Sequence, residues 1–218
     1  MVQDVIYKFM PKRFRCSFLD GTSIRVGTLF DFRKQEHHGG GKVDPLEGII
    51  GVNAGPTGKV TEDMSYDLKA GLMNSGVDIS GLSFRNNNVD VAFSSEDYFV
   101  FCASLELQQA VAEGLDPDYD CCIAIRGLRE FGQKVSRGLM DRYPNIEQVR
   151  NVGGLVEYEE RLFSPSNFAG MASPFLKETR FAYQKEYRIC FAVGAGDLAP
   201  TNIAIDPEGC GFKPVWER

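Results

Sequence analysis

A late segment of the chain places an amide, a carboxylate and a guanidinium beside an apolar run. Gln184, Glu186 and Arg188 stand two residues apart, and the apolar residues 189–193 follow them. Because side chains on a strand point alternately to opposite faces, we expect these three to share one face of a strand. A carboxylate at the edge of a core is costly without partners, so Glu186 is a candidate functional residue. A strand-end ion pair between Glu186 and Arg188 explains the same pattern and stays open.

Two more polar residues stand on predicted strands in other parts of the chain. Lys8 follows Tyr7 on the first predicted strand, and Ser104 ends the apolar run of residues 97–104. In chain order, a basic residue, a hydroxyl and the Gln-x-Glu triplet at 184–186 resemble the ADP-ribosyltransferase family, in which the corresponding residues surround NAD. In that family the basic residue is Arg or His and the hydroxyl belongs to Ser-Thr-Ser, whereas this chain has Lys8 and Cys-Ala-Ser.

The ADP-ribosyltransferase resemblance implies a role for each residue. Glu186 would be the catalytic carboxylate, binding a ribose hydroxyl and stabilising the positive charge that develops as nicotinamide leaves. Gln184 would orient the acceptor, Lys8 would contact phosphate or ribose, and Ser104 would brace the nicotinamide pocket. Residues 164–180 would form the substrate-facing loop. The resemblance thus predicts a mono-ADP-ribosyltransferase that uses NAD as its substrate.

Two arginines near the first strands are further candidates for binding that nucleotide. Arg25 and Arg33 are predicted to contact its anionic groups together with Lys8. Guanidinium groups suit this task because they bind phosphate through two parallel hydrogen bonds.

Landmarks along much of the chain also resemble an uncharacterised family of bacterial and phage proteins, a domain of unknown function. That family reads Tyr-Lys-Tyr, Asn-Asp-Pro-Phe-Glu, Cys-Phe-Ser and Tyr-Glu-Lys-Glu-Tyr-Arg in this order. The corresponding segments here are Ile6-Tyr7-Lys8-Phe9, Val43-Asp44-Pro45-Leu46-Glu47, Cys102-Ala103-Ser104 and Tyr183-Gln184-Lys185-Glu186-Tyr187-Arg188. This resemblance implies an order of elements and no activity. The alternative function is therefore a non-catalytic phage or host-defence protein that binds a protein partner or sequesters a small nucleotide.

The spacing of the remaining motifs disfavours other chemistries. Residues 53–60 lack the first Gly and the final Ser or Thr of a phosphate-binding loop. His37 and His38 are adjacent and precede three glycines, which is not metal-ligand spacing, so no metal site is expected. Asp44 and Glu47 could bind a cation, but an Asp-capped turn is the preferred interpretation.

Length and composition indicate one globular domain over residues 1–218. Of the 218 residues, 43% are hydrophobic and 25% charged. A net charge of -6 opposes non-specific binding to nucleic acid, and no apolar run is long enough to span a membrane. The start of the chain lacks the pattern of a secretion signal, and the cysteines stand mostly in apolar runs. We therefore expect a cytoplasmic protein whose partner is a small nucleotide or a protein acceptor.

Many strands and few helices, without regular alternation, favour an α+β fold over a doubly wound sheet. The ADP-ribosyltransferase resemblance further implies a split, mostly antiparallel sheet. The predicted strands cover residues 4–9, 23–28, 97–104, 120–125, 154–163, 181–193 and 203–205, the predicted helices cover 105–112 and 128–143, and a loop covers 35–58.

Overall fold

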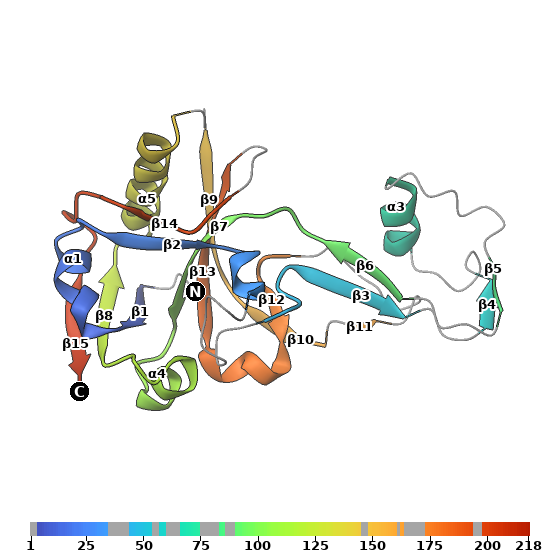
Figure 1. The fold of residues 1–218 in the computed structure, drawn as a ribbon, viewed down its shortest axis with the longest axis horizontal. Helices are drawn as coiled ribbons and strands as arrows, with labels where there is room; N and C mark the ends of the chain where they lie inside the picture. Colours follow the sequence, from blue (N-terminus) through green and yellow to red (C-terminus); the bar gives the residue numbers. More distant parts are fainter. Residues whose placement is uncertain are drawn as a thin grey trace.

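The computed structural model describes residues 4–34, 44–53, 57–59, 66–74, 83–85, 90–144, 148–160, 162–163, 173–193 and 198–218. Within these ranges the chain has an α+β fold with few helices and an eight-stranded main sheet in which every pairing is antiparallel (Figure 1). The predicted class, α+β with a mostly antiparallel sheet, is confirmed. The extent of a single domain over residues 1–218 stays a prediction.

The elements have the following bounds. The main sheet contains β1 (Val5–Met10), β2 (Ile24–Thr28), β7 (Phe99–Ser104), β8 (Cys121–Arg126), β9 (Val149–Leu155), β13 (Glu186–Val193), β14 (Thr201–Ile203) and β15 (Lys213–Glu217). The other strands are β3 (Ile49–Asn53), β4 (Thr57–Lys59), β5 (Ser83–Arg85), β6 (Asp90–Ser94), β10 (Glu157–Glu159), β11 (Leu162–Phe163) and β12 (Leu176–Glu178). The helices are α1 (Arg15–Leu19), α3 (Tyr66–Asn74), α4 (Gln109–Leu115), α5 (Leu128–Arg142) and the short 3₁₀ helices η1 (Lys12–Phe14), η2 (Asp31–Arg33) and η4 (Thr179–Gln184).

The main sheet forks along its central strand, β7. One edge of β7 pairs with β13 from Phe99 to Ser104. Its other edge pairs with β2 at the start of the strand, where Gly27 lies opposite Val100, and with β1 at the end, where Tyr7 lies opposite Ser104. Beyond the fork, β14 extends the β2 arm, and β8 and β15 extend the β1 arm. The two arms therefore diverge from β7 on either side of Cys102.

Helix α5 covers one face of the sheet, as Figure 1 shows. Its predicted apolar face is confirmed, because Phe131, Val135 and Leu139 are fully buried in the main core. The ring of Phe131 lies 4.8 Å from that of Phe101 on β7. The opposite face of β7 lines a cleft at the fork of the sheet.

The predicted strand over residues 181–193 is wrong in its first half. Only β13, which begins at Glu186, is extended; Gln184 lies on η4 and therefore does not share a strand face with Glu186. Lys185 between them has a left-handed backbone with φ 45°. Its carbonyl accepts a hydrogen bond from Leu105 N at 2.7 Å, and Phe181 of η4 is buried. Tertiary contacts thus override the alternation of the sequence.

Other boundaries also differ from the predictions. The helix expected over 105–112 forms later, as α4, and the strand expected over 154–163 is divided among β9, β10 and β11. Strand β15 was not predicted, because Pro214 argues against a strand; it lies at the sheet edge with a bulge at Pro214, where proline is tolerated. The predicted loop over 35–58 contains β3. His37, His38 and the glycines at 39–41 lie outside the described residues.

Strands β3 and β6 lead away from the main sheet towards α3, β4 and β5 (Figure 1). The turn over residues 44–48 begins this arm. Asp44 Oδ1 accepts a hydrogen bond from Leu46 N at 3.1 Å, and Glu47 N donates to Asp44 O at 3.0 Å. The predicted Asp-capped turn is therefore confirmed.

From the left-handed backbone at Lys185 we predict how substitutions there change the free energy of unfolding. Outside glycine, this conformation costs about 1–2 kcal/mol, and the Lys185 side chain is exposed, so its removal loses little packing. Lys185→Gly should leave the free energy of unfolding unchanged or raise it by up to about 1 kcal/mol, whereas Lys185→Val should lower it by about 1–2 kcal/mol. Urea denaturation of both variants measures this, and equal stability of the two would contradict the assignment.

Candidate functional site

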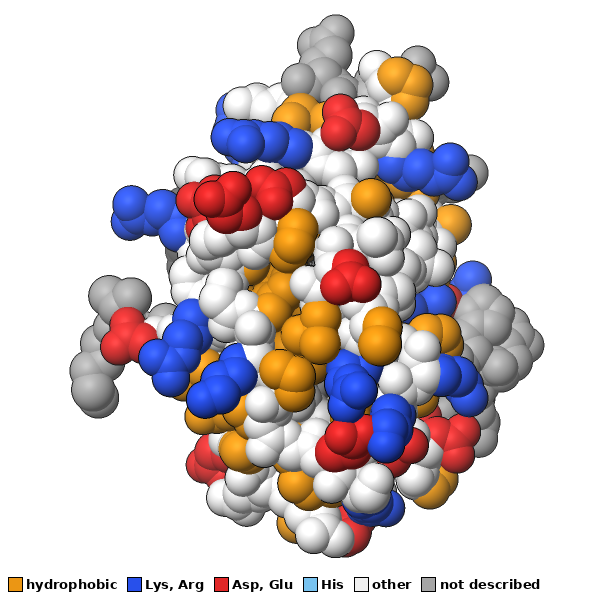
Figure 2. Space-filling view, turned by 90° about the vertical axis from the view of Figure 1, so that its left-hand side faces the viewer, with side chains coloured by type: hydrophobic (Ala, Val, Ile, Leu, Met, Phe, Trp, Pro, Cys, Tyr) orange, Lys and Arg blue, Asp and Glu red, His pale blue; other side chains and the backbone are white. Residues whose placement is uncertain are grey.

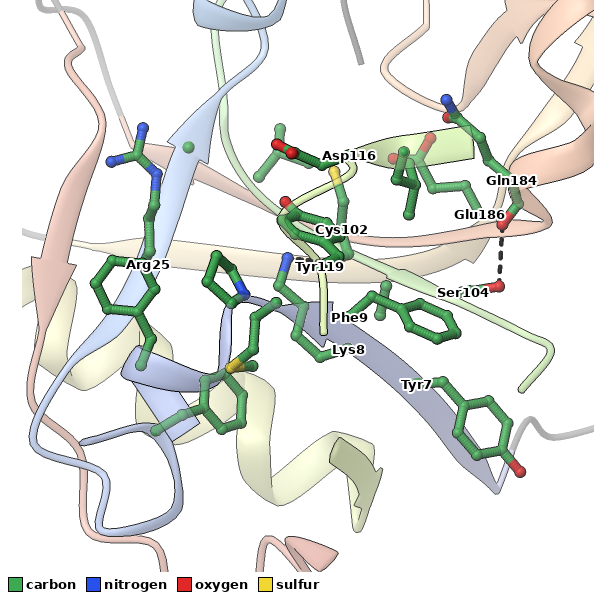
Figure 3. Close-up of a pocket in the computed structure, with 18 of the residues that line it drawn as sticks. Tyr7, Lys8, Phe9, Arg25, Cys102, Ser104, Asp116, Tyr119, Gln184 and Glu186 are labelled. Atoms are coloured by element: carbon green, nitrogen blue, oxygen red, sulfur yellow. Dashed lines mark hydrogen bonds between the residues drawn. The ribbon is translucent and has the colours of Figure 1, made fainter. Parts of the chain in front are cut away.

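A cleft of about 490 Å³ opens at the fork of the main sheet (Figure 3). Strands β1 and β2 line it from the two arms, β7 and β13 line it from the trunk, and the segment after α4 adds Asp116, Asp118 and Tyr119. Its volume lies in the range of about 300–1,000 Å³ that is typical of small-molecule sites. Of the six predicted site residues, five line this cleft: Lys8, Arg25, Ser104, Gln184 and Glu186.

Glu186 belongs to a buried network of four charged groups, which we call the charge network: Glu47, Lys177, Glu186 and Arg188. Arg188 Nε donates to Glu186 Oε1 at 2.8 Å, and Lys177 Nζ donates to Glu186 Oε2 at 3.0 Å. Arg188 also binds Glu47 with two hydrogen bonds, of 2.7 and 3.1 Å. No side chain of the network is more than 7% exposed. The alternative interpretation, an ion pair between Glu186 and Arg188, is therefore present in the structure. It is buried and forms part of a network of four residues, not a pair at a strand end.

The charge network keeps Glu186 ionised. Burial alone would raise the pKa of Glu186, but the nearby charges of Arg188 and Lys177 outweigh it and hold this pKa well below its ordinary value. The neighbouring thiol of Cys102, which burial holds neutral by raising its pKa, also helps to lower the pKa of Glu186. The network contains two carboxylates and two cations, so its net charge is zero. It nevertheless holds the Glu186 carboxylate in a fixed position.

Lys8 completes the backbone hydrogen bonding at the fork. Its Nζ donates to Cys102 O at 2.7 Å and lies 4.8 Å from the centre of the Phe101 ring. Cys102 lies between Val100, which pairs with β2, and Ser104, which pairs with β1. A buried carbonyl needs a donor, and here a side chain supplies it. Lys8 thus has a structural task as well as a position in the cleft.

Ser104 and Gln184 fix η4 against β7. Ser104 Oγ donates to Gln184 O at 3.0 Å, drawn as the dashed line in Figure 3, and accepts from Glu106 N at 3.2 Å. The side-chain carbonyl of Gln184 accepts from Lys177 Nζ at 2.7 Å, and its amide donates to Tyr183 Oη at 3.3 Å. Both Ser104 and Gln184 are 3% exposed. Their polar groups therefore position the residues around Glu186.

The two predicted arginines have different positions. Arg25 lines the cleft from β2, is 59% exposed, and has Nη2 3.9 Å from Asp31 Oδ2. Arg33 does not line the cleft. It donates to Glu47 O at 2.7 Å and stacks on Phe30, with 3.8 Å between its guanidinium carbon and the ring centre. Arg33 thus supports the turn that carries Glu47.

Sequence reasoning missed Lys177 and did not connect Glu47 with Glu186. Lys177 is the buried middle residue of the short strand β12, between two half-buried neighbours. The sequence assigns Glu47 to a turn or, less favoured, to a cation site, whereas in the structure it binds Arg188 across 141 positions of sequence. A charged residue such as Lys177 in a short strand gives only a weak sequence signal of burial. The long-range pairing of Glu47 with Arg188 gives no signal in the sequence.

Figure 2 shows the side of the molecule on which α1 and β15 lie in Figure 1. Charged side chains of both signs are interspersed there around a central apolar strip. Arg15, for example, pairs with Glu217 at 2.8 Å. On the part of this face that the structure describes, no extended basic surface of the kind that nucleic-acid-binding proteins present is visible.

Among the described residues, no three or more His, Cys, Asp or Glu side chains gather in a way that could hold a metal ion. All six cysteines are free thiols. No described helix has the length and apolar character needed to cross a membrane.

Comparison with known protein families, with curated proteins and with solved structures finds no match to this chain. Both family resemblances of the sequence therefore stay predictions.

The charge network predicts a large effect on stability. Glu47→Gln removes the bidentate partner of Arg188 and leaves a buried cation partly unpaired, which should lower the free energy of unfolding by about 3–5 kcal/mol. Glu160 is exposed, so Glu160→Gln is the matched control and should change stability by less than about 0.5 kcal/mol. Chemical denaturation of both variants measures the difference, and similar small losses would contradict the role of the network.

The lowered pKa of Glu186 predicts acid sensitivity. In the unfolded chain this carboxyl titrates near its ordinary value of 4.5, whereas in the folded protein it releases its proton at lower pH. Its contribution to stability is therefore complete above about pH 4.5 and is lost as the pH falls towards the folded pKa. Urea denaturation at several pH values should show a steeper loss below pH 4.5 for the wild type than for Glu186→Gln. Parallel curves would show that Glu186 is not the responsible group.

Proposed function

We propose that the cleft binds NAD or a related nucleotide, and that Glu186 serves as the catalytic carboxylate of ADP-ribosyl transfer on an ADP-ribosyltransferase-like split sheet. One observation carries the proposal. Lys8, Ser104 and Glu186 come from distant parts of the chain, yet β1, β7 and β13 bring them to one cleft. These are the three positions that the family resemblance predicts to surround NAD.

The state of Glu186 suits this chemistry. As the bond between ribose and nicotinamide breaks, its electrons leave with nicotinamide and positive charge develops on the sugar. An ionised carboxylate held in a poorly hydrated site stabilises that charge more strongly than one in water. An acceptor group then bonds to the sugar carbon and loses its proton. The charge network supplies such a carboxylate, already ionised and fixed in place.

The hydrogen bonds of Glu186 indicate where a ribose hydroxyl would bind. A carboxylate offers about four acceptor positions, and here Arg188 takes two and Lys177 one. The neighbouring Cys102 thiol, which also lowers the pKa of Glu186, is a weak donor and lines the cleft. A ribose hydroxyl would therefore replace the Cys102 thiol and leave the two ionic partners in place.

The pairing of Glu186 with two buried cations favours a second candidate function. A buried carboxylate held by two cations can serve the structure without any ligand. In that case the cleft would sequester a small nucleotide without turning it over, as expected for a non-catalytic phage or host-defence protein. The two candidates share the binding site and differ in whether nicotinamide is released.

Release of nicotinamide from NAD by the purified protein tests the transferase. Glu186→Gln should slow release by about 100-fold or more, because it removes the charge that faces the sugar. Glu47→Gln is the matched control: it removes a charge from the same network, but Glu47 does not line the cleft. It should retain most of the turnover when assayed below its own thermal midpoint.

Each result of this assay separates the candidates. Equal losses in both variants would show that only the integrity of the network matters and would contradict catalysis by Glu186. No turnover, with a thermal midpoint that rises on addition of NAD, would favour the sequestering protein. No turnover and no shift of the midpoint would reject both candidates. A stability loss in Glu186→Gln does not decide, because its partners are buried.

A further inference from the structure

Strand β2 buries one face in the core and presents a polar face to the cleft. Ile24 and Val26 of β2 are fully buried in the main core, while Arg25 and Gly27, which alternate with them, line the cleft. Asn202 of β14 lies opposite Arg25 in the sheet and also lines the cleft. This pair of strands therefore turns hydrogen-bond donors, including a guanidinium, into the cleft.

Arg25 is available for a ligand. Its side chain is 59% exposed, and its ion pair with Asp31 is 3.9 Å long, beyond hydrogen-bond distance. A guanidinium carries five N–H donors in a planar fork that matches phosphate. Arg13 of η1 is exposed and lines the same cleft. Two cations from different elements thus face one cavity.

Charge is distributed unevenly along the cleft. Figure 3 shows Arg25 at one side and Gln184, Ser104 and Glu186 at the other, with Lys8 between them. The segment after α4 adds the carboxylates of Asp116 and Asp118. The charge of Glu186 is balanced by Lys177 and Arg188, which also line the cleft. Asp116 and Asp118 repel a phosphate, whereas Arg25 and Arg13 attract one. An anionic ligand is therefore directed to the arginine end.

From this arrangement we infer that Arg25, assisted by Arg13, binds the phosphate groups of the ligand and so sets its direction in the cleft. The ligand class is a nucleotide with a pyrophosphate, whose phosphates lie at the β2 end while its ribose extends towards Glu186. This inference rests on the proposed function; it adds Arg13 to the phosphate contact that the sequence predicts for Arg25, and it gives the ligand a direction in the cleft.

Isothermal titration calorimetry with ADP-ribose and adenosine tests this assignment. ADP-ribose carries the pyrophosphate, and adenosine carries none. Arg25→Gln should weaken ADP-ribose binding about tenfold or more, the size expected for a charge-assisted hydrogen bond, and Arg13→Gln should weaken it several-fold. Adenosine binding should not change in either variant. Arg137→Gln is the matched control, because Arg137 is exposed on α5 and does not line the cleft; it should behave as the wild type.

The outcomes separate this inference from the proposed function. If Arg25→Gln binds ADP-ribose as the wild type does, or loses ADP-ribose and adenosine affinity equally, phosphate recognition by Arg25 is overturned while NAD turnover can still stand. If Arg25→Gln selectively loses ADP-ribose and the wild type releases no nicotinamide from NAD, the inference holds and the transferase fails. If the wild type binds no ADP-ribose, the inference is overturned together with nucleotide binding.

Discussion

The rest of the structure depends on the burial of Arg188. Among the described residues it is the largest side chain that is fully buried, and a buried cation is tolerated only when anions and hydrogen-bond acceptors surround it. Glu186 supplies one carboxylate from the same strand, Glu47 supplies another from the turn before β3, and Pro174 O accepts a further hydrogen bond. The need to neutralise one guanidinium thus ties the β3 turn, β13 and the segment before β12 together.

The same constraint shapes the cleft. Lys177 reaches Glu186 and Gln184 at once, so β12 and η4 are held around the carboxylate. At the fork, Lys8 donates a hydrogen bond to the carbonyl of Cys102. The arms of the sheet can therefore separate there without leaving a buried acceptor unpaired. The residues that give the cleft its chemistry are therefore the ones that hold it open. Under the proposed function, structural and functional roles coincide at these positions, and a loss of stability alone does not distinguish them.

Local sequence patterns predicted the elements whose structure depends on neighbouring residues. The strand predicted from the apolar run of β7 and the helix predicted from the three- and four-residue spacing of α5 are confirmed. A strand buried on both faces has a continuous apolar run, and a helix buried on one face has a periodic one. The position of Gln184 was not predictable, because the left-handed turn at Lys185 follows from contacts with Leu105 and Ser104, about 80 positions earlier. The partnership of Arg188 with Glu47 likewise spans 141 positions and has no local signature.

The choice that the sequence posed, between a catalytic carboxylate and an ion pair, changes once the partners of Glu186 are known. Two cations hold the carboxylate ionised, as stabilisation of a developing positive charge requires, and they also satisfy it structurally. The ion pair is therefore a precondition for catalysis as much as an alternative to it. Under the proposed function, the two roles are separated on the cleft side of Glu186, where the Cys102 thiol is a weak donor. The proposal requires a ligand that takes the place of this thiol; without one, Glu186 serves as part of the core.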